Sequence, residues 1–468
     1  MKTNHLARLY MFRSDNAASN CLLEKYDVPS PRYTSYPTVP FWDNRELEQE
    51  RWLQHVKQAF HKTNTSEGIS LYLHLPFCEQ LCTYCGCNKR ITVNHKVEEP
   101  YLEALLQEWQ QYLAVFEEKP RITELHLGGG TPTFFSAANL KYLLEKLLKD
   151  AEVPANAQFS VEVHPNYTTV EQLQVLYEAG FRRLSVGVQD FDLRVQFVIN
   201  RIQTFEQTKE VFDIARAIGY TSINADIIYG LPLQTTDSIQ HTIACVKELR
   251  PERIAFYSYA HVPWKSKSQR RYSDADLPAP FLKRALYEFG RNLLQEAGYV
   301  EVGLDHFSLP EDELYMAAQH GSLHRNFMGY TSHHTELLIG LGASSISDTG
   351  TAFMQNQKEV EAYEEAVQRG KLPLMKGHEL TSEDILLRRH IKNLMCQFST
   401  SWEADELPYL VDALVRLQPL AEDKLVDYST QHIEVLPTGK PFVRNIAMCL
   451  DARLWDSQPT TPVFSRSV

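Results

Sequence analysis

The sequence has no long hydrophobic run. Among its 468 residues, no apolar stretch approaches the roughly 18 residues that a membrane-crossing helix needs. Residues 1–30 also lack the apolar core of a secretory signal peptide. We therefore expect no membrane contact and a cytoplasmic location, where cellular reductants keep thiols from forming disulfides.

An excess of basic residues is also absent. The chain carries 47 Lys and Arg against 59 Asp and Glu, a net charge of -12. This balance argues against a general nucleic-acid-binding surface, although a few arginines in a pocket can still bind a small anion. Repeats and low-complexity linkers are missing as well. The 43% hydrophobic content and the length indicate a globular protein with more than one folding unit.

Cysteine is scarce, but it is unevenly distributed. Of eight cysteines, four fall within ten positions of the stretch "LHLPFCEQLCTYCGCNKR". The other four are scattered, and we expect them to be ordinary small apolar residues: Cys21, Cys245, Cys396 and Cys449. In a reducing compartment, the crowded cysteines are expected to be ligands or catalysts rather than disulfide partners.

The spacing of the clustered cysteines favours an iron–sulfur centre. Cys78, Cys82 and Cys85 form a Cys-x3-Cys-x2-Cys pattern, which can hold three irons of a [4Fe–4S] cube and leave the fourth open. A catalytic metal site needs such an open position. A zinc knuckle with Cys87 or a histidine as fourth ligand, and a redox dithiol, are the alternatives. Zinc sites use paired Cys-x2-Cys units with a longer spacer, so we favour the cluster and expect Cys87 to lie beside it without ligating it.

Strand-like and helix-like segments alternate between residue 68 and about residue 300. The strand-like segments show a period of two, as in "FSVEVHP", and the helical segments often end in glycine. At least six βα units fit this region, which predicts an α/β fold with either a complete or partial (β/α) barrel or an open doubly wound sheet.

In both architectures, chemistry collects where the strands end. Polar or glycine-rich positions follow the predicted strands: the cysteine loop, Gly128–Thr131, Glu162, Gln189–Asp190, Asp226 and Ala260–His261. We expect the glycines to let a ligand approach the backbone where a Cβ would collide with it. His74, on the strand that enters the cysteine loop, is a candidate hydrogen-bond partner near the cluster.

The flanking regions have a different character. An N-terminal extension contains "SPRYTSYPT", and the composition shifts beyond about residue 360. There, a capped helix is predicted in "LTSEDILLRRHIKNLMCQF", and a hairpin followed by a helix is predicted in "LVDYSTQHIEVLPTGKPFVRNIAMCL". This pattern is typical of a small winged-helix-like domain, for which the acidic chain favours a packing or lid role. The expected division is 1–62, an N-terminal extension; 63–300, a barrel; 301–360, a barrel-closing and substrate-site segment; and 361–468, a mostly helical domain.

These motifs resemble a known family. The cysteine spacing with Tyr84 and the stretch "HLGGGTPT" resemble the radical S-adenosylmethionine (SAM) superfamily. More specifically, "PRYTSYPT", "CGCNK", "SVGVQDF", "INADIIYGLP", "GLDHF", "LHRNFMGYT" and "FSRSV" resemble the oxygen-independent coproporphyrinogen III oxidases (dehydrogenases) of heme biosynthesis. The match runs from about Tyr26 to the C-terminus. The resemblance implies a partial barrel of six βα units, a helical C-terminal domain, a [4Fe–4S] cluster on three cysteines and two SAM molecules.

The resemblance also implies roles for individual residues. It places the first SAM against Tyr72, Gly129, Glu162 and Ile346. It places the second against Gly130, Thr131, Gln189, Arg201, Asp226 and Ala260. Tyr84 is expected to contact a cofactor, and Tyr72, Cys87 and Glu162 are expected to be catalytic. The sequence departs from the family at Met328, where glutamine is common, and at His164, where an acidic residue is common.

The implied reaction converts two propionates of coproporphyrinogen III to vinyl groups, giving protoporphyrinogen IX. It implies an oxidoreductase, a reducing electron donor such as a flavodoxin-type protein, a monomer and no nucleic-acid partner. Arg32 and Arg325 are candidates to bind propionates, because a guanidinium matches a carboxylate. Two alternatives are a heme-binding chaperone on the same barrel, which usually lacks the Cys-Gly-Cys step and the "PRYTSYPT" stretch, and a zinc-stabilised winged-helix regulator.

Overall fold

The computed structural model describes residues 17–42, 47–264, 266–457 and 463–467. Its centre is a twelve-stranded sheet in the order β16-β15-β14-β13-β1-β4-β5-β6-β7-β8-β10-β9. Six consecutive parallel strands form the middle of this sheet: β1 (Ile69–Leu75), β4 (Ile122–Gly129), β5 (Gln158–Val163), β6 (Phe181–Gln189), β7 (Ser222–Tyr229) and β8 (Arg253–Ser258).

The order of these strands decides between the two predicted architectures. Each new strand joins the same edge of the sheet, as in a barrel, whereas a doubly wound sheet would reverse direction. The sheet does not close, because β1 pairs with β13 and β8 pairs with β10. The fold is therefore a partial (β/α)6 barrel, one of the alternatives that the sequence pattern left open and the one that the family resemblance implies.

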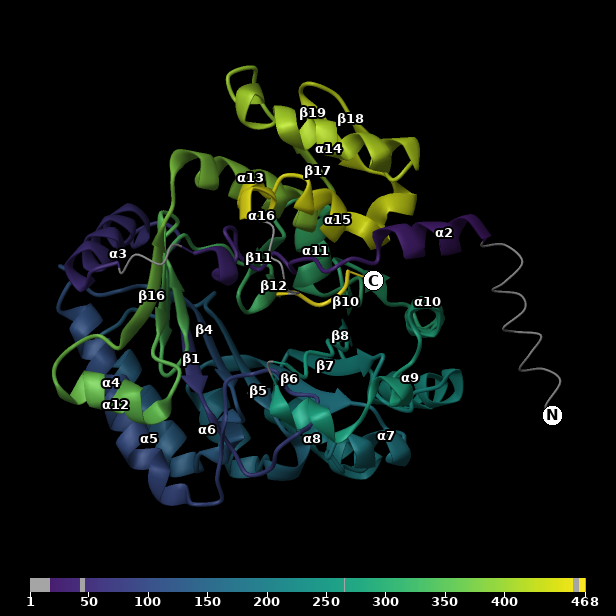
Figure 1. Cartoon of the computed structure of the whole chain (residues 1–468). Helices are drawn as coiled ribbons and strands as arrows, with labels where there is room; N and C mark the ends of the chain where they lie inside the picture. The colour runs from purple at the N-terminus through teal and green to yellow at the C-terminus, as the bar shows by residue number, and fades with distance from the viewer. Residues whose placement is uncertain (1–16, 43–46, 265, 458–462, 468) are drawn as a thin grey trace.

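Helices follow the strands and cover the outside of the curved sheet, as Figure 1 shows. They are α4 (Glu98–Leu113), α5 (Ala137–Leu148), α6 (Val170–Glu178), α8 (Phe205–Ile218), α9 (Thr236–Leu249) and α10 (Pro280–Glu296). Threonines at 169, 204 and 235 begin α6, α8 and α9 with reciprocal capping boxes. At the end of α8, Gly219 adopts φ 118°, a conformation that favours glycine.

The period of two in the strands separates core from lumen. In β5, Phe159, Val161 and Val163 are at most 5% exposed and pack in the main hydrophobic core, towards the helices. The intervening Ser160 and Glu162 face the inside of the barrel, where they line a pocket. Because side chains alternate across a strand, each strand contributes apolar residues to the core and polar residues to the lumen.

Strands between residues 300 and 379 extend both edges of the sheet. Strand β10 (His306–Ser308) pairs antiparallel with β8, and β9 (Val300–Glu301) pairs antiparallel with β10. Strand β13 (Leu338–Leu341) runs parallel to β1, and three antiparallel strands continue from it: β14 (Ile346–Asp348), β15 (Ala352–Asn356) and β16 (Leu374–Glu379). The domain boundaries given above stay predictions.

A mostly helical region lies above the sheet in Figure 1. Its elements are α13 (Ser382–Gln397), β17 (Ser399–Ser401), α14 (Val411–Glu422), β18 (Val426–Tyr428), β19 (His432–Val435), α15 (Val443–Met448) and α16 (Ala452–Ser457). The strands form a small sheet in the order β17-β19-β18, and the region has its own hydrophobic cluster. The capped helix and the hairpin followed by a helix are as predicted, with Thr381 capping α13.

The N-terminal segment runs between this region and the barrel. After α2 (Ala17–Tyr26), Pro29 forms a β-bridge with Arg466. Arg444 of α15 donates to the carbonyl oxygens of Ser30 and Pro31. Residues far apart in the sequence therefore join the C-terminal region to the N-terminal extension.

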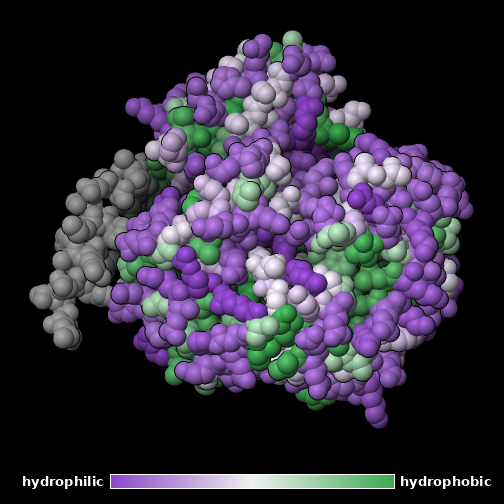
Figure 2. Space-filling model, turned by 180° about the vertical axis from the view of Figure 1, so that it is seen from behind, coloured by the Kyte–Doolittle hydropathy of each residue, from purple (hydrophilic) through white to green (hydrophobic). Residues whose placement is uncertain are grey.

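The remaining elements are short or peripheral. They are α3 (Gln49–Thr63), β2 (Phe77–Cys78), β3 (Arg90–Ile91), α7 (Leu193–Val198), α11 (Glu313–Gln319), β11 (His324–Asn326), β12 (Gly329–Thr331) and α12 (Val360–Gln368). Within the described ranges, no helix combines the length and the apolar character required to span a bilayer. The face in Figure 2 is largely hydrophilic, with separate apolar areas.

Candidate active site

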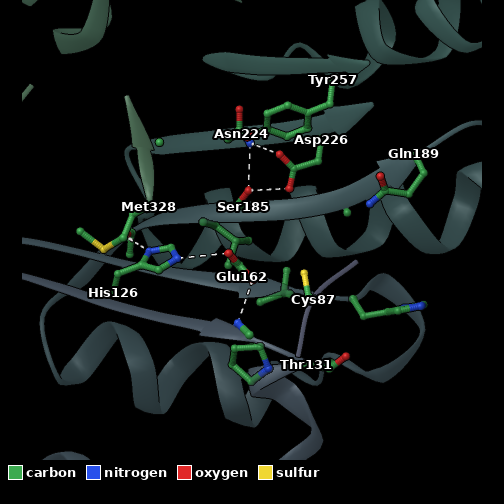
Figure 3. Close-up of a pocket in the computed structure, with 18 of the residues that line it drawn as sticks. Cys87, His126, Thr131, Glu162, Ser185, Gln189, Asn224, Asp226, Tyr257 and Met328 are labelled. Carbon is green, nitrogen blue, oxygen red and sulfur yellow. Dashed lines mark hydrogen bonds and ion pairs between the residues drawn. The ribbon is translucent and has the colours of Figure 1, made fainter. Parts of the chain in front are cut away.

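A pocket of about 370 Å³ occupies the lumen of the partial barrel (Figure 3). Its lining runs from the cysteine loop at the ends of the strands down to Arg183 and Arg253, near the beginnings of β6 and β8. The inward residues of four neighbouring strands alternate along its wall: Glu124 and His126, Ser160 and Glu162, Arg183, Ser185, Gly187 and Gln189, and Ser222, Asn224 and Asp226. The lumen is a polar cavity, unlike the filled interior of a closed (β/α)8 barrel.

The cysteine loop forms one rim of this pocket. Cys78, Cys82, Cys85 and Cys87 all line it, and all are free thiols. Lys89 steadies the loop, because its ammonium donates to the carbonyl oxygens of Cys85 and Cys87 at 3.1 and 3.3 Å. Burial raises the pKa of the Cys78 thiol to about 11, so a metal must displace its proton on binding.

The choice between a zinc site and an iron–sulfur cluster rests on the cysteine spacing, because Cys-x3-Cys-x2-Cys matches the three ligands of a [4Fe–4S] cube. Among the described residues, no group of three His, Cys, Asp or Glu side chains is arranged to hold a single metal ion.

The glycine-rich loop packs against the chain that leads into the cysteines. The amides of Gly130 and Thr131 donate to the carbonyl oxygens of Leu75 and Phe77 at 2.8 and 2.9 Å. A Cβ on Gly130 would lie 2.5 Å from the carbonyl oxygen of Pro76. The contacts that exclude a Cβ here come from the protein itself, and the approach of a ligand to these glycines stays a prediction. The glycines fix the position of the cysteine loop, and Gly129 and Gly130 also line the pocket.

Glu162 lies on the cluster side of the pocket, near Cys87 in Figure 3. One carboxylate oxygen is 3.3 Å from Nε2 of His126, and the other accepts from the Gly129 amide at 3.2 Å. Enclosure in the barrel would raise the pKa of Glu162, but these two donors outweigh it and hold the pKa below its usual value. Glu162 is therefore a carboxylate at neutral pH.

Tyr72 and His74 support this side from β1. The Tyr72 ring stacks on His126, with 5.8 Å between ring centroids, and its hydroxyl lies 3.1 Å from Nδ1 of His74. Nε2 of His74 is 2.9 Å from the carbonyl oxygen of Asn88, just after the cysteine loop. Burial lowers the pKa of His74, so the ring is neutral, with Nε2–H donating to Asn88 and Nδ1 accepting from Tyr72.

Asp226 lies on the opposite side of the pocket, on β7. Its carboxylate accepts from Asn224 at 2.8 Å and from the Ser185 hydroxyl at 2.9 Å (Figure 3). Enclosure in the barrel is the main influence, and it raises the pKa of Asp226 to about 6. Gln189, which follows on β6, also lines the pocket and adopts φ 66°.

Arg201 connects this side to the cysteine loop. Its guanidinium donates to the Gly187 carbonyl oxygen at 2.6 Å and lies 3.7 Å from the sulfur of Cys82. Its buried Nε has no hydrogen-bond partner among the described residues. A buried donor without a partner is costly, and a bound ligand with an acceptor would satisfy it.

Comparison with known proteins agrees with this geometry. The profile of the radical SAM superfamily matches residues 72–246. Oxygen-independent coproporphyrinogen III oxidase from Salmonella typhimurium is 40% identical over 92% of this chain and 95% of that protein, and the Escherichia coli K12 enzyme is 39% identical over the same shares. A solved structure of E. coli coproporphyrinogen III oxidase, described as a radical SAM enzyme, superposes with a TM-score of 0.85, covering 90% of this chain and 97% of that one at 39% identity.

The chain belongs to the oxygen-independent coproporphyrinogen III oxidase family. It is therefore a radical SAM oxidoreductase, with a [4Fe–4S] cluster and SAM as cofactors. The pocket fits both groups. Three cysteines on one rim provide thiolates, and Arg201, whose buried Nε has no partner among the described residues, lines the same lumen as the carboxylates of Glu162 and Asp226.

The structure brings together most of the residues that the oxidase resemblance implicates. Those that line the pocket are Cys78, Cys82, Tyr84, Cys85, Cys87, Gly129, Gly130, Thr131, Glu162, Gln189, Arg201 and Asp226. Tyr72, Ala260 and Ile346 are not part of its lining. Tyr72 stands behind His126, the Ala260 carbonyl oxygen accepts from Gln269, and Ile346 lies on β14 at the far edge of β13.

The two departures from the family pattern also line the pocket. Met328 contributes its side chain beside His126 (Figure 3). Burial lowers the pKa of His164 to about 2, so this histidine carries no charge at neutral pH. Its Nδ1 accepts from the Asn166 amide at 3.2 Å, which gives it a local structural bond.

Sequence reasoning missed several residues that shape the pocket. His126 holds Glu162, and Ser185 and Asn224 hold Asp226. The signal was present, because His126 is two residues before Gly128 and Asn224 two before Asp226, on the same face of their strands. The His126–Glu162 and Ser185–Asp226 contacts join different strands and cannot be read from spacing alone, whereas Asn224 and Asp226 are neighbours on one face of β7.

The two arginine candidates have different surroundings. Arg32 lies 3.4 Å from Asp305 and donates to the Ser258 carbonyl oxygen, in a smaller cavity outside the barrel pocket. Arg325 is 8% exposed and lies over the ring of Tyr330, which lines the pocket. Its Nε and Nη1 have no partner among the described residues.

Proposed function

We propose that this chain oxidatively decarboxylates two propionates of coproporphyrinogen III to vinyl groups, giving protoporphyrinogen IX without oxygen. The observation that carries the proposal is one pocket in which the cysteine motif faces Glu162 and Asp226 in a chain of this family. When bound, the cluster and SAM would supply the radical chemistry that removes a β-hydrogen from a propionate, after which CO2 leaves, one electron passes to an external acceptor and a vinyl group remains.

Cys78, Cys82 and Cys85 hold the cluster in this proposal, and Cys87 stays beside it. Glu162 accepts from the amino group or ribose hydroxyls of the first SAM, because it is ionised and 44% exposed to the pocket. Gly129 lines the same side, and Tyr72 and Ile346 act from behind the lining. Tyr72 keeps the His126–Glu162 pair in place through its stacked ring.

The second SAM occupies the opposite side. Gly130, Thr131 and Gln189 line its place, Arg201 offers its unpartnered Nε, and Asp226 accepts from ribose hydroxyls. Ala260 adds a contact from beyond β8, and Tyr84 closes the space next to the cysteines. This SAM either serves the second propionate or positions the substrate.

Arg325 is the better candidate for a propionate. It is buried and has no carboxylate partner among the described residues, whereas Arg32 is already next to Asp305. An unpaired buried cation is costly, and an anionic substrate group near Tyr330 would offset that cost. We further propose a cytoplasmic monomer that receives electrons from a flavodoxin-type donor and binds neither nucleic acid nor membranes.

The test is anaerobic incubation of the reconstituted protein with dithionite, SAM and coproporphyrinogen III. The expected result is protoporphyrinogen IX together with 5′-deoxyadenosine, quantified in the same sample. SAM cleavage without a vinyl product would support the assigned cofactors and refute coproporphyrinogen III as the substrate. Stoichiometric heme binding without turnover would instead indicate a heme chaperone.

A further inference from the structure

The outer surface of the cysteine loop is open to solvent. Leu81 and Gly86 are exposed and do not line the pocket, whereas Cys78, Cys82 and Cys85 are half-buried and line it. An electron from a protein donor has to reach the cluster from outside the barrel.

Large apolar side chains are exposed beside this loop. Thr83 donates its amide to the Ile199 carbonyl oxygen at 2.9 Å, and Asn200 donates to the Leu81 carbonyl oxygen at 2.8 Å. These bonds hold α7 and the residues after it against the cysteines. The exposed side chains are Leu81 (36%), Leu193 (70%), Phe197 (68%) and Ile202 (47%). Large apolar side chains exposed in one region of an otherwise polar surface are typical of an interaction site.

A basic segment joins the loop from its other side. In the short 3₁₀ helix η5 (Lys267–Arg271), Ser268 donates to the Thr83 carbonyl oxygen at 3.2 Å and Gln269 to that of Tyr84 at 3.0 Å. Exposed cationic and aromatic side chains of this segment are Trp264, Lys267, Arg270 and Arg271.

The cations of this segment are not neutralised by contact. Within the described part of the chain, no carboxylate forms an ion pair with Lys267, Arg270 or Arg271. The acids that follow have other neighbours, because Asp274 lies 3.5 Å from His261 and Asp276 accepts from Ser273. These exposed cations form a local basic area on a chain of net charge -12, and such an area attracts an anionic partner.

We propose that an acidic one-electron carrier protein docks on this surface, which we call the loop face: Leu81, Leu193, Phe197, Ile202, Trp264, Lys267, Arg270 and Arg271. The inference rests on the proposed function, which requires an external reductant. One electron leaves the reduced carrier and reduces the cluster, with no transfer of atoms. The cations attract the acidic carrier against the net repulsion of the chain, and the apolar side chains provide the close packing that brings the two centres together.

The test compares two charge-reversed variants of the full chain. The loop-face variant is Lys267→Glu/Arg270→Glu/Arg271→Glu. The matched control is Lys141→Glu/Lys146→Glu/Lys149→Glu, which makes the same change in net charge at the exposed side of α5 and the residue after it. The probe is purified flavodoxin, oxidised for binding and fully reduced for electron transfer. Binding is measured by fluorescence anisotropy at low and high salt.

We expect the loop-face variant to bind oxidised flavodoxin at least ~10-fold more weakly at low salt than the control variant does. With reduced flavodoxin, 5′-deoxyadenosine formation should fall to a similar extent, while the dithionite-driven rate stays unchanged in both variants. Equal affinities for the two variants would overturn the proposal. So would self-association through the loop face, detected by sedimentation as a dimer that the loop-face variant abolishes. Absence of dithionite-driven SAM cleavage in the wild type would refute the proposed function, and the binding measurement would still decide the docking.

Discussion

The two sides of the barrel pocket carry similar carboxylates in different surroundings. Glu162 on β5 accepts a hydrogen bond from the Gly129 amide and pairs with His126, and its pKa falls below the usual value. Asp226 on β7 has only neutral donors from Asn224 and Ser185, and its pKa rises to about 6. The difference indicates that the cluster side keeps a fixed negative charge, whereas the opposite side holds a charge that a ligand or a drop in pH can remove.

The largest effect is expected from the cysteines. Cys82→Ala should give a colourless protein with no detectable SAM cleavage, because a cube held by two thiolates is not retained. Iron and sulfide content and the visible absorbance measure the loss.

Cys87→Ala is the matched control, since this residue lines the same rim. It should keep the cluster and its colour. Loss of iron on replacing Cys87 by itself, with the other three cysteines intact, would mean that Cys87 is a fourth ligand. The open position of the cluster would then be filled.

Glu162→Gln is expected to cause the next largest loss of activity. It removes the fixed charge and puts an amide where His126 and Gly129 now meet a carboxylate. A hydrogen bond to a charged group contributes about 1.5–3 kcal/mol, so dithionite-driven 5′-deoxyadenosine formation should fall roughly 10- to 150-fold. SAM cleavage at the wild-type rate would show that the cluster side does not need this charge.

Asp226→Asn should distinguish the functions of the two sides of the pocket. We expect SAM cleavage to persist while vinyl product falls roughly 10-fold or more, because the second ligand loses a charged acceptor. In the wild type, Asp226 is ionised above its pKa of about 6 and takes up a proton below it, so product formation should drop as the pH falls from 7 to 5.

The Asp226→Asn variant should not show this loss of product formation at low pH, which we call the acid limb of the pH profile. Asp190→Asn is the control, because burial raises the pKa of Asp190 to about 6 as well, but this carboxylate bonds to Gln234 and Thr242 and does not line the pocket. An acid limb that vanished in the Asp190 variant and stayed in the Asp226 variant would contradict the assignment.

The smallest effect is expected from Met328→Gln. A neutral hydrogen bond contributes about 0.5–1.5 kcal/mol, so restoring an amide should change KM for coproporphyrinogen III by only about 2- to 10-fold. The steady-state rate of porphyrin formation measures this, with SAM cleavage in the absence of substrate as the reference. A change in that reference rate would place Met328 against SAM instead of the substrate.

Much of the barrel was predictable because it depends on local periodicity. The alternation in "FSVEVHP" and "SINADIIYG" identified strands and also which side chains face inward. The capping residue Thr381 and the hairpin at residues 426–435 were predictable for the same reason, since a cap or a hairpin is specified by neighbours in the chain.

The partners of the inward residues were not predictable. His126 and Glu162 are 36 positions apart, and they meet because β4 and β5 are adjacent and in register. The protein contacts of the glycines were not predictable either, since a Cβ at Gly130 would meet Pro76 and Phe77. Such contacts depend on how two segments pack, which spacing does not encode.

The sequence by itself determined a thiol motif with room for three irons and a set of strands with one polar face, because both depend on short-range spacing. Only the tertiary structure decided that the barrel stays open, that Glu162 and Asp226 have opposite pKa shifts, and that apolar and basic side chains meet beside the cysteine loop. Register, enclosure and the pairing of distant segments set these features, and they exist only once the chain has folded.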